Sequence, residues 1–149
     1  MPHQDKKLST ELGHSSFEGD PFAWAPISKL IGLEVQPALT STPAGRAEIF
    51  LNVDSRMHNP MGFVHGGIIS LLADATMGIA FGRTLNEKHG FATVEMKTNY
   101  VRPVKEARLH AAAELIQRGL RIGFVECRIV DHRGKLIATA SCTCTVNTL

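Results

Sequence analysis

A single carboxylate inside an apolar segment is the first feature that suggests chemistry. Residues 66–81 read GGIISLLADATMGIAF, and Asp74 is their only charged residue. Apolar or small residues fall on every face of a helix with this sequence, so protein is expected to surround it. An ionised carboxylate in such surroundings is costly unless it is paired, hydrogen-bonded or protonated. Asp74 is therefore either a structural residue held by a partner group or a reacting group.

The residues before this helix bear on that choice. His65-Gly66-Gly67 places two glycines where the helix begins, although glycine costs helix stability relative to alanine. Backbone N–H groups at a helix start bind anions and developing negative charge, and glycine lets a ligand approach them closely. Asn59 and His65 add polar side chains there. A turn that needs glycine would explain the pair alone, but the combination with Asp74 favours an active site.

A metal site built from His58, His65 and Asp74 is the competing interpretation. The sequence has no HxxxH or HxxEH pair, which would place two ligands on one face of a helix. We therefore predict that no metal is bound.

The spacing of the two reacting groups predicts a dimer. Gly66 and Asp74 are eight residues apart, which is about 12 Å along one helix. A single reacting carbonyl cannot touch both directly. If both groups act in one reaction, they come from two copies of the helix packed antiparallel, in a homodimer with two composite sites.

Alternating apolar and polar residues predict the strands that position these groups. A short helix within residues 21–31, ended by Gly32, precedes strands at 33–40 and 46–53. Four more strands are expected at 93–100, 109–116, 122–130 and 136–146. In the first of these, Val94, Met96 and Tyr100 alternate with Thr93, Glu95, Lys97 and Asn99. Strands joined by short turns pair antiparallel, so we predict one α+β domain over residues 21–149, with the sheet curled around the helix.

Composition limits the other function classes. The chain has 149 residues, 44% of them hydrophobic, and a net charge of +2 with scattered charges, so neither nucleic acid nor a membrane surface is implied. Residues 1–20 are polar, read as a flexible tail, and contain no segment resembling a signal peptide. The three cysteines, Cys127, Cys142 and Cys144, lack metal or disulfide spacing and suggest a reducing compartment. We predict a cytoplasmic protein.

The ordered motifs resemble the PaaI-type acyl-CoA thioesterases of the hotdog-fold superfamily. They are HNPMGFVHGGIISLLADATMG at 58–78, TVEMKTNYVRPV at 93–104 and a last strand starting GKLIA at 134, within a resemblance that spans about 22–146. The resemblance implies an antiparallel sheet around one long helix, and dimers that pair into homotetramers.

The resemblance also implies a role for each site residue. Asp74 acts as nucleophile or as general base on water, and the Gly66 N–H polarises the thioester carbonyl. His65 and Asn59 support that oxyanion site, while Thr93 orients the attacking water or the substrate. No cofactor is expected, because CoA is part of the substrate. The residues expected to contact substrate or CoA are Gly67, Tyr100, Arg102, Lys105, Gln117, Arg118, Gly119 and Arg121.

Two other functions on the same fold stay open. An enoyl-CoA hydratase or dehydratase is faintly suggested by the Asn-Pro of residues 58–67, but the His comes five residues after Pro60 rather than two. A non-catalytic acyl-CoA-binding module is the second, although no helix-turn-helix segment accompanies the domain. The acyl group is not specified, because aryl, medium-chain and long-chain acyl-CoAs all fit. The candidates for an apolar pocket are Met57, Met61, Phe63, Met77, Phe81 and Tyr100, although helical Met and Phe are more often core residues.

Overall fold

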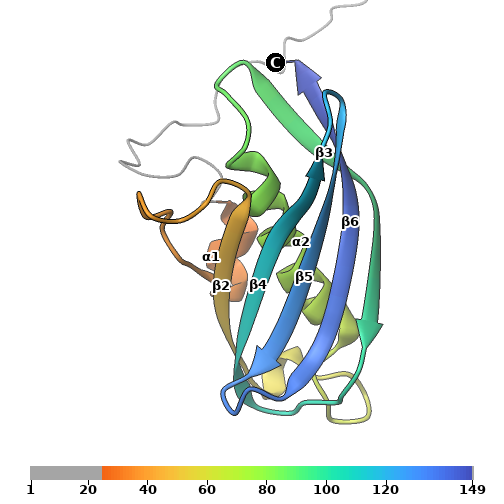
Figure 1. The fold of residues 1–149 in the computed structure, drawn as a ribbon. Coiled ribbons are helices and arrows are strands. Elements are labelled where there is room, and N and C mark those ends of the chain that lie inside the picture. The colour runs from red at the N-terminus through yellow and green to blue at the C-terminus, as the bar shows by residue number, and fades with distance from the viewer. Residues whose placement is uncertain (1–24, 149) are drawn as a thin grey trace, which may run out of the picture.

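The computed structural model describes residues 25–148, so the tail predicted at 1–20 lies outside the described residues. The elements are α1 (Pro26–Ile31), β1 (Glu34–Val35), β2 (Arg46–Val53), η1 (Ser55–Met57), α2 (Gly66–Gly82), β3 (His89–Tyr100), β4 (Ala107–Arg118), β5 (Ile122–Asp131) and β6 (Leu136–Thr148). The strands form an antiparallel sheet in the order β1-β2-β4-β5-β6-β3. In Figure 1 this sheet curves around α2. The predicted α+β fold, a sheet wrapped around one long helix, is confirmed.

The hydrophobic core lies between the sheet and α2. Strands β2, β5 and β6 alternate buried and exposed residues largely as predicted, and their buried side chains meet Leu72, Met77 and Phe81 of the helix. Phe50, the apolar residue out of step in β2, lies on the outer face, where its ring stacks on His110 with centroids 4.5 Å apart. Met77 and Phe81 are fully buried, so they belong to the core and not to a substrate pocket.

The described elements before β2 are short. Helix α1 runs from Pro26 to Ile31, and Gly32, with a φ of 82°, is the left-handed cap expected there. Residues 21–24 of the predicted helix segment lie outside the described residues. The strand predicted at 33–40 is only Glu34–Val35. Pro37 has no N–H to donate to a strand ladder, which accounts for the early end of the strand.

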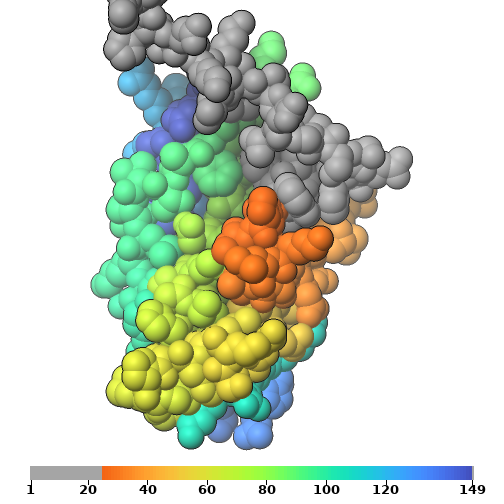
Figure 2. All heavy atoms as spheres, turned by 180° about the vertical axis from the view of Figure 1, so that it is seen from behind, coloured from red at the N-terminus to blue at the C-terminus, as the bar shows by residue number. Residues whose placement is uncertain are grey.

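Helix α2 is not enclosed on all sides, contrary to the prediction. The sheet covers the side that carries Leu72 and Phe81, whereas Asp74 and Gly67 are exposed and Leu71 is only half-buried. Figure 2 shows this open side from behind, with the yellow-green atoms of α2 at the surface between β3 and α1. A single curved sheet leaves one face of the helix uncovered. That face also carries apolar residues, so the sequence pattern is apolar all round and does not show which face is open.

A β-bulge in β3 interrupts the alternation expected from the sequence. Thr93 pairs with Cys144 and Glu95 with Thr143, so Val94 is an extra residue in the ladder. The extra residue reverses the alternation before it. Thr93 therefore faces α2, and Val94 is 61% exposed.

Candidate active site

The start of α2 leaves one backbone N–H open. His65 is the N-cap, and its Nδ1 accepts a hydrogen bond of 2.9 Å from the Gly67 N–H. The Gly66 N–H has no hydrogen-bond partner within residues 25–148. Gly66 is thus the residue that offers a free donor to a ligand, while the N–H of Gly67 is already used by His65.

The ring of Tyr100, the last residue of β3, covers Gly66. Its hydroxyl lies 3.2 Å from the Gly66 carbonyl oxygen, to which it can donate. A Cβ added at position 66 would lie 3.2 Å from Cζ of this ring and 3.3 Å from its hydroxyl. Glycine therefore allows the close approach of this ring, and its φ is not in the left-handed region.

Ser70 is a polar residue of the site that the sequence interpretation missed. Its Oγ lies 2.6 Å from the Tyr100 hydroxyl and 3.4 Å from Oγ1 of Thr98. The signal was present, because Ser70 is a polar residue one turn after Gly66 in an otherwise apolar helix. Its bond fixes the ring of Tyr100 over the helix start.

Asn59 shapes the loop that leads to the helix. Its Oδ1 accepts bonds from the N–H groups of Met61 at 2.9 Å and Phe63 at 3.2 Å. The Asn59 side-chain NH₂ has no hydrogen-bond partner in the described part of the chain. Asn59 therefore both builds the loop and leaves a donor available to a ligand.

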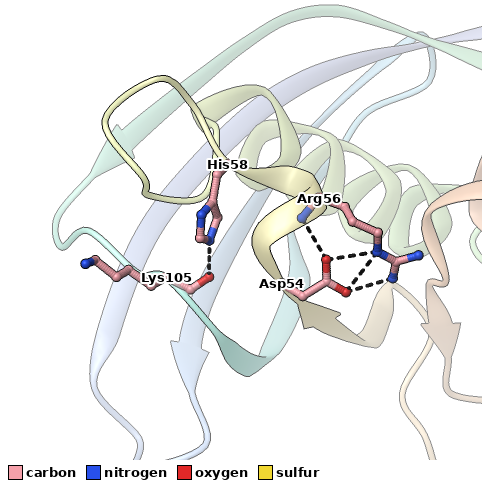
Figure 3. Close-up of polar contacts among 4 residues, drawn as sticks. All are labelled: Asp54, Arg56, His58 and Lys105. Carbon is pink, nitrogen blue, oxygen red and sulfur yellow. Dashed lines mark hydrogen bonds and ion pairs between the residues drawn. The ribbon is translucent and has the colours of Figure 1, made fainter.

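Polar contacts on both sides of this loop hold it in place (Figure 3). The side chain of Asp54 caps η1 by accepting from the Arg56 N–H at 2.9 Å, and the two side chains form an ion pair at 2.7 Å. The hydrogen bond from the Arg56 side chain is the main cause that lowers the pKa of Asp54 to about 2. His58 Nε2 lies 2.9 Å from the Lys105 carbonyl oxygen, which ties the loop to the β3–β4 connection.

A cavity of about 310 Å³ joins four of the predicted residues at this end of α2. Asn59, Gly66, Tyr100 and Arg102 all line it. The rest of its wall is apolar and is formed by Met61, Phe63, Val64, Ile69, Val101, Pro103, Val104 and Ile137. The end of the cavity at Gly66 thus combines a free N–H with an apolar chamber, as a site for an acyl thioester would.

Asp74 and Thr93 form a second group on the open side of the helix. The Thr93 hydroxyl donates to Asp74 Oδ1 at 3.1 Å, and Cys144 Sγ lies 4.0 Å behind the same hydroxyl. The bulge at Val94 is what aims Thr93 at α2. Gly66 lies eight residues, or about 12 Å, back along the helix, so a single thioester carbonyl cannot contact both Gly66 and Asp74 of one chain.

The predicted CoA-contacting residues lie at opposite ends of α2 in one chain. Tyr100, Arg102 and Lys105 are at the helix start, whereas the β4–β5 hairpin lies at its end, where the Arg118 guanidinium lies 5.2 Å from the ring centre of Phe81. In Figure 1 the hairpin is at the top and the 100–106 connection at the bottom. Gln117, Gly119 and Arg121 belong to the same hairpin. A single chain does not bring the two groups together.

Comparison with known proteins decides the family. The model of the Thioesterase superfamily matches residues 61–138, which is more than half of the chain and includes Gly66, Asp74, Thr93 and Tyr100. The chain belongs to the thioesterase superfamily. It is a thioester hydrolase with the hotdog fold, and both the residues around Gly66 and those around Asp74 fall within the matched segment.

Individual members of the superfamily agree with this assignment. The chain is 27% identical to the 1,4-dihydroxy-2-naphthoyl-CoA hydrolase of Listeria monocytogenes over 80% of this chain and 94% of that protein. The structure of a thioesterase from Haemophilus influenzae superimposes with a TM-score of 0.75 at 25% identity, covering 83% of each chain. The PaaI protein from the phenylacetic acid degradation operon of Escherichia coli shares the fold, with a TM-score of 0.71 at 21% identity over 80% of this chain and 82% of that one.

Two findings bear on metals and membranes. Within residues 25–148 no three His, Cys, Asp or Glu side chains gather where they could bind a metal ion. None of the helices in the described range is long and apolar enough to cross a membrane.

Proposed function

We propose that this thioesterase hydrolyses acyl-CoA at composite sites between two antiparallel copies of α2. The observation that carries the proposal is the division of the site. A free Gly66 N–H and an Asp74–Thr93 pair lie about 12 Å apart beside the helix face that the sheet leaves open. Antiparallel packing of two such faces brings Gly66 of one copy to Asp74 of the other, twice. It also covers the apolar residues of that face.

The groups brought together in this way suit thioester hydrolysis. The thioester carbonyl oxygen accepts from the Gly66 N–H, which stabilises the negative charge that develops there in the transition state. In one route Asp74 attacks the carbonyl carbon, the C–S bond breaks to release the CoA thiolate, and water then hydrolyses the resulting acyl-aspartyl anhydride to the free acid. In the other route Asp74 takes a proton from a water that attacks the carbonyl carbon directly, and cleavage of the C–S bond gives the free acid and the CoA thiol. Thr93 holds the carboxylate of Asp74 through its hydrogen bond.

The same two-fold arrangement accounts for the separated CoA residues. If Gly66 faces Asp74, then Ser70, four residues from each, lies at the axis. Phe81, eleven residues after Ser70, then reaches about 10 Å beyond the start of the partner helix. The hairpin that carries Arg118 therefore approaches the region of Lys105 on the other copy. Cationic groups from both copies would meet the CoA phosphates.

For the acyl group we propose aryl-CoA thioesters as the first class to test. The cavity beside Gly66 is mainly apolar, and the aromatic ring of Tyr100 and that of Phe63 form part of its wall. The relative from Listeria monocytogenes is named for an aromatic acyl-CoA. Medium- and long-chain acyl-CoAs form the comparison group. The proposed reaction needs no cofactor.

A substrate panel tests the proposed function. Purified protein is incubated with benzoyl-, phenylacetyl-, octanoyl- and palmitoyl-CoA, and free thiol is measured. We expect thiol release, highest with the aryl esters. Loss of the double bond of crotonyl-CoA without thiol release would instead indicate a hydratase, and tight binding of all esters without turnover would indicate a binding module.

Removal of the Thr93 hydroxyl gives a smaller predicted effect on the same reaction. Thr93→Val keeps the side-chain shape but leaves Asp74 without the donor at 3.1 Å. Loss of one hydrogen bond to a charged group is expected to lower kcat by about 10-fold and to leave KM little changed. Thr93→Ser, which keeps the hydroxyl, should retain most of the activity. Equal kcat values for the valine and serine variants would contradict a role for this bond.

We place the enzyme in the cytoplasm. Support comes from its three cysteines, which are free and buried. Burial raises the pKa of Cys127 to about 12, and the hydrogen bond with Cys144 together with burial raises that of Cys142. Free cysteines that form no disulfide suit a reducing compartment.

A further inference from the structure

Two buried thiols lie behind the Asp74–Thr93 pair, and the proposed mechanism does not use them. Cys142 and Cys144 are fully buried, and their sulfur atoms are 3.7 Å apart. They are two residues apart in β6 and therefore point to the same face of the sheet, into the core against α2. Cys144 Sγ lies 4.0 Å from Thr93 Oγ1. The thiols thus connect the core to the group that holds Asp74.

The strand register brings Cys144 to Thr93. The two residues are direct partners in the β3–β6 ladder, so their side chains stand next to each other on one face of the sheet. This arrangement depends on the bulge at Val94, which turns Thr93 toward α2. The preceding buried residues on this face of β6, Ala138 and Ala140, have no side-chain donor. A donor side chain therefore stands in β6 at the position where it can reach the Thr93 hydroxyl.

The ionised carboxylate of Asp74 sets the direction of each hydrogen bond in this chain of groups. A carboxylate only accepts, so the single hydroxyl hydrogen of Thr93 goes to Asp74, at 3.1 Å. The Thr93 oxygen then offers its sulfur neighbour only lone pairs, and the Cys144 S–H donates to it. Because this uses the one hydrogen of Cys144, the contact between the sulfurs is a bond from the Cys142 S–H. All three hydrogen bonds run toward Asp74.

The pKa shifts of the two thiols agree with this order. The hydrogen bond with Cys144, together with burial, raises the pKa of Cys142, so Cys142 keeps the hydrogen that it donates. The same hydrogen bond lowers the pKa of Cys144. A more acidic S–H is a stronger donor, and hydrogen bonds in a chain polarise one another. The bond from Cys144 to Thr93 is therefore stronger than that of an isolated thiol.

We propose that Cys144 is a positioning residue for the proposed hydrolysis and acts through Thr93. Its S–H occupies a lone pair of Thr93 Oγ1, which holds the hydroxyl in the rotation that points its hydrogen at Asp74. Without this donor the hydroxyl is free to turn away, and the carboxylate is held less well for attack or for proton transfer. This role rests on the proposed function, since it requires that Asp74 reacts.

Replacement of Cys144 by alanine and by serine tests the donor. Cys144→Ala removes it, and because a thiol is a weak donor, kcat for acyl-CoA hydrolysis should fall by only about 3-fold, with KM little changed. Serine is nearly the same size as alanine but has a hydroxyl, so Cys144→Ser should stay within about 1.5-fold of the wild-type kcat. Equal kcat values for the alanine and serine variants would overturn the proposal.

Cys127→Ala is the matched control for loss of a buried thiol. Cys127 is free and buried in β5, where its ladder partners are Ala113 and Ala140. Its replacement should lower the unfolding temperature about as much as Cys144→Ala does, but kcat should not change. A loss of kcat equal to that of Cys144→Ala would assign the effect to core packing and contradict a positioning role.

A double-mutant cycle with Thr93→Val shows whether Cys144 acts through Thr93. If it does, Cys144→Ala has no further effect once the hydroxyl is gone, so the double variant should match Thr93→Val, at about 10-fold below the wild-type kcat. Independent effects would multiply to a loss of about 30-fold and would contradict the proposal.

The infrared S–H stretch tests the direction of the bond independently of activity. A thiol that donates absorbs at lower frequency than a free thiol, so the wild type should show a shifted band that is lost in Cys144→Ser. Thr93→Val removes the acceptor, and this band should then move to higher frequency. A band that stays in place would show that Cys144 does not donate to Thr93, even in an active thioesterase. A wild type with the shifted band but no hydrolysis would instead refute the proposed function, and with it the role of Cys144 in the reaction.

Discussion

Replacement of Asp74 by asparagine is expected to lower kcat for acyl-CoA hydrolysis by about 10²- to 10⁴-fold. The amide has nearly the same shape and can still bond to Thr93, but it neither attacks the thioester nor accepts a proton from water. Because Asp74 is exposed in the single chain, its replacement removes nothing from the core. Thermal unfolding should therefore be unchanged, and the loss should be one of chemistry.

Glu95→Gln is the matched control for this variant. Glu95 is a nearby carboxylate just beyond the bulge in β3, and its Oε1 accepts from the Thr143 hydroxyl at 2.7 Å on the outer side of the sheet. The Glu95→Gln variant loses one negative charge, as Asp74→Asn does, but it changes no residue of the proposed site. A rate within about 3-fold of wild type is expected for the control. If Asp74→Asn were as active as Glu95→Gln, Asp74 would not be the catalytic carboxylate.

Gly66→Ala is expected to lower kcat/KM by about 10²-fold, a size typical for loss of one oxyanion donor. The new methyl group would stand 3.2 Å from the ring of Tyr100, and relief of that contact moves either the ring or the start of the helix. The free Gly66 N–H is then covered or misdirected. Alanine is a better helix former than glycine by about 1 kcal/mol, so stability should not fall with the activity.

Gly78→Ala makes the comparison specific to the helix start. Position 78 is in the same helix, and an added Cβ there would meet the ring of Phe91 at a similar 3.3 Å. The change in helix propensity and the crowding against an aromatic ring are thus alike. Hydrolysis rates and unfolding temperatures are measured for Gly66→Ala and Gly78→Ala. The comparison separates loss of the Gly66 N–H from crowding against an aromatic ring. A parallel loss of activity in both would point to crowding in general and not to the Gly66 N–H.

The sequence was sufficient to predict the helix, most strands and the residues that gather at the helix start. Residues 66–81 are too long and too apolar for a strand, and the two glycines after His65 mark where the helix begins. Alternation located β2 and β6 because their inner faces are uniformly apolar. Asn59 and Gly66 do line one cavity with Tyr100 and Arg102, which come from a stretch more than 30 residues further along the chain.

Three features could not be predicted, each for a physical reason. The bulge at Val94 is hidden because valine suits either face of a strand, so the pattern does not show the extra residue. The open face of α2 is apolar like the covered one, and sequence does not reveal which protein layer covers each face. The third feature is that His65 caps the helix and accepts the hydrogen bond of the Gly67 N–H, so of the two glycines Gly66 alone offers a free donor. Two adjacent glycines look equivalent in the sequence.

The separation of the predicted CoA-binding residues within one chain says most about how the site is assembled. Arg102 and Arg118 lie at opposite ends of α2 in one chain, and Gly66 and Asp74 lie too far apart for one carbonyl. The proposed antiparallel pairing of helices would account for both separations. The composite site is therefore the central claim.

Complementation between two inactive variants tests that claim most directly. Asp74→Asn and Gly66→Ala chains are co-expressed with different tags, and acyl-CoA hydrolysis is measured on the mixture and on dimers purified through both tags. Random pairing makes half of the dimers mixed, each with one intact and one doubly altered site, so the mixture should recover about a quarter of wild-type activity. The doubly purified dimers should recover about half. Activity no higher than the average of the two variants alone would show that each chain carries a complete site and would contradict the account.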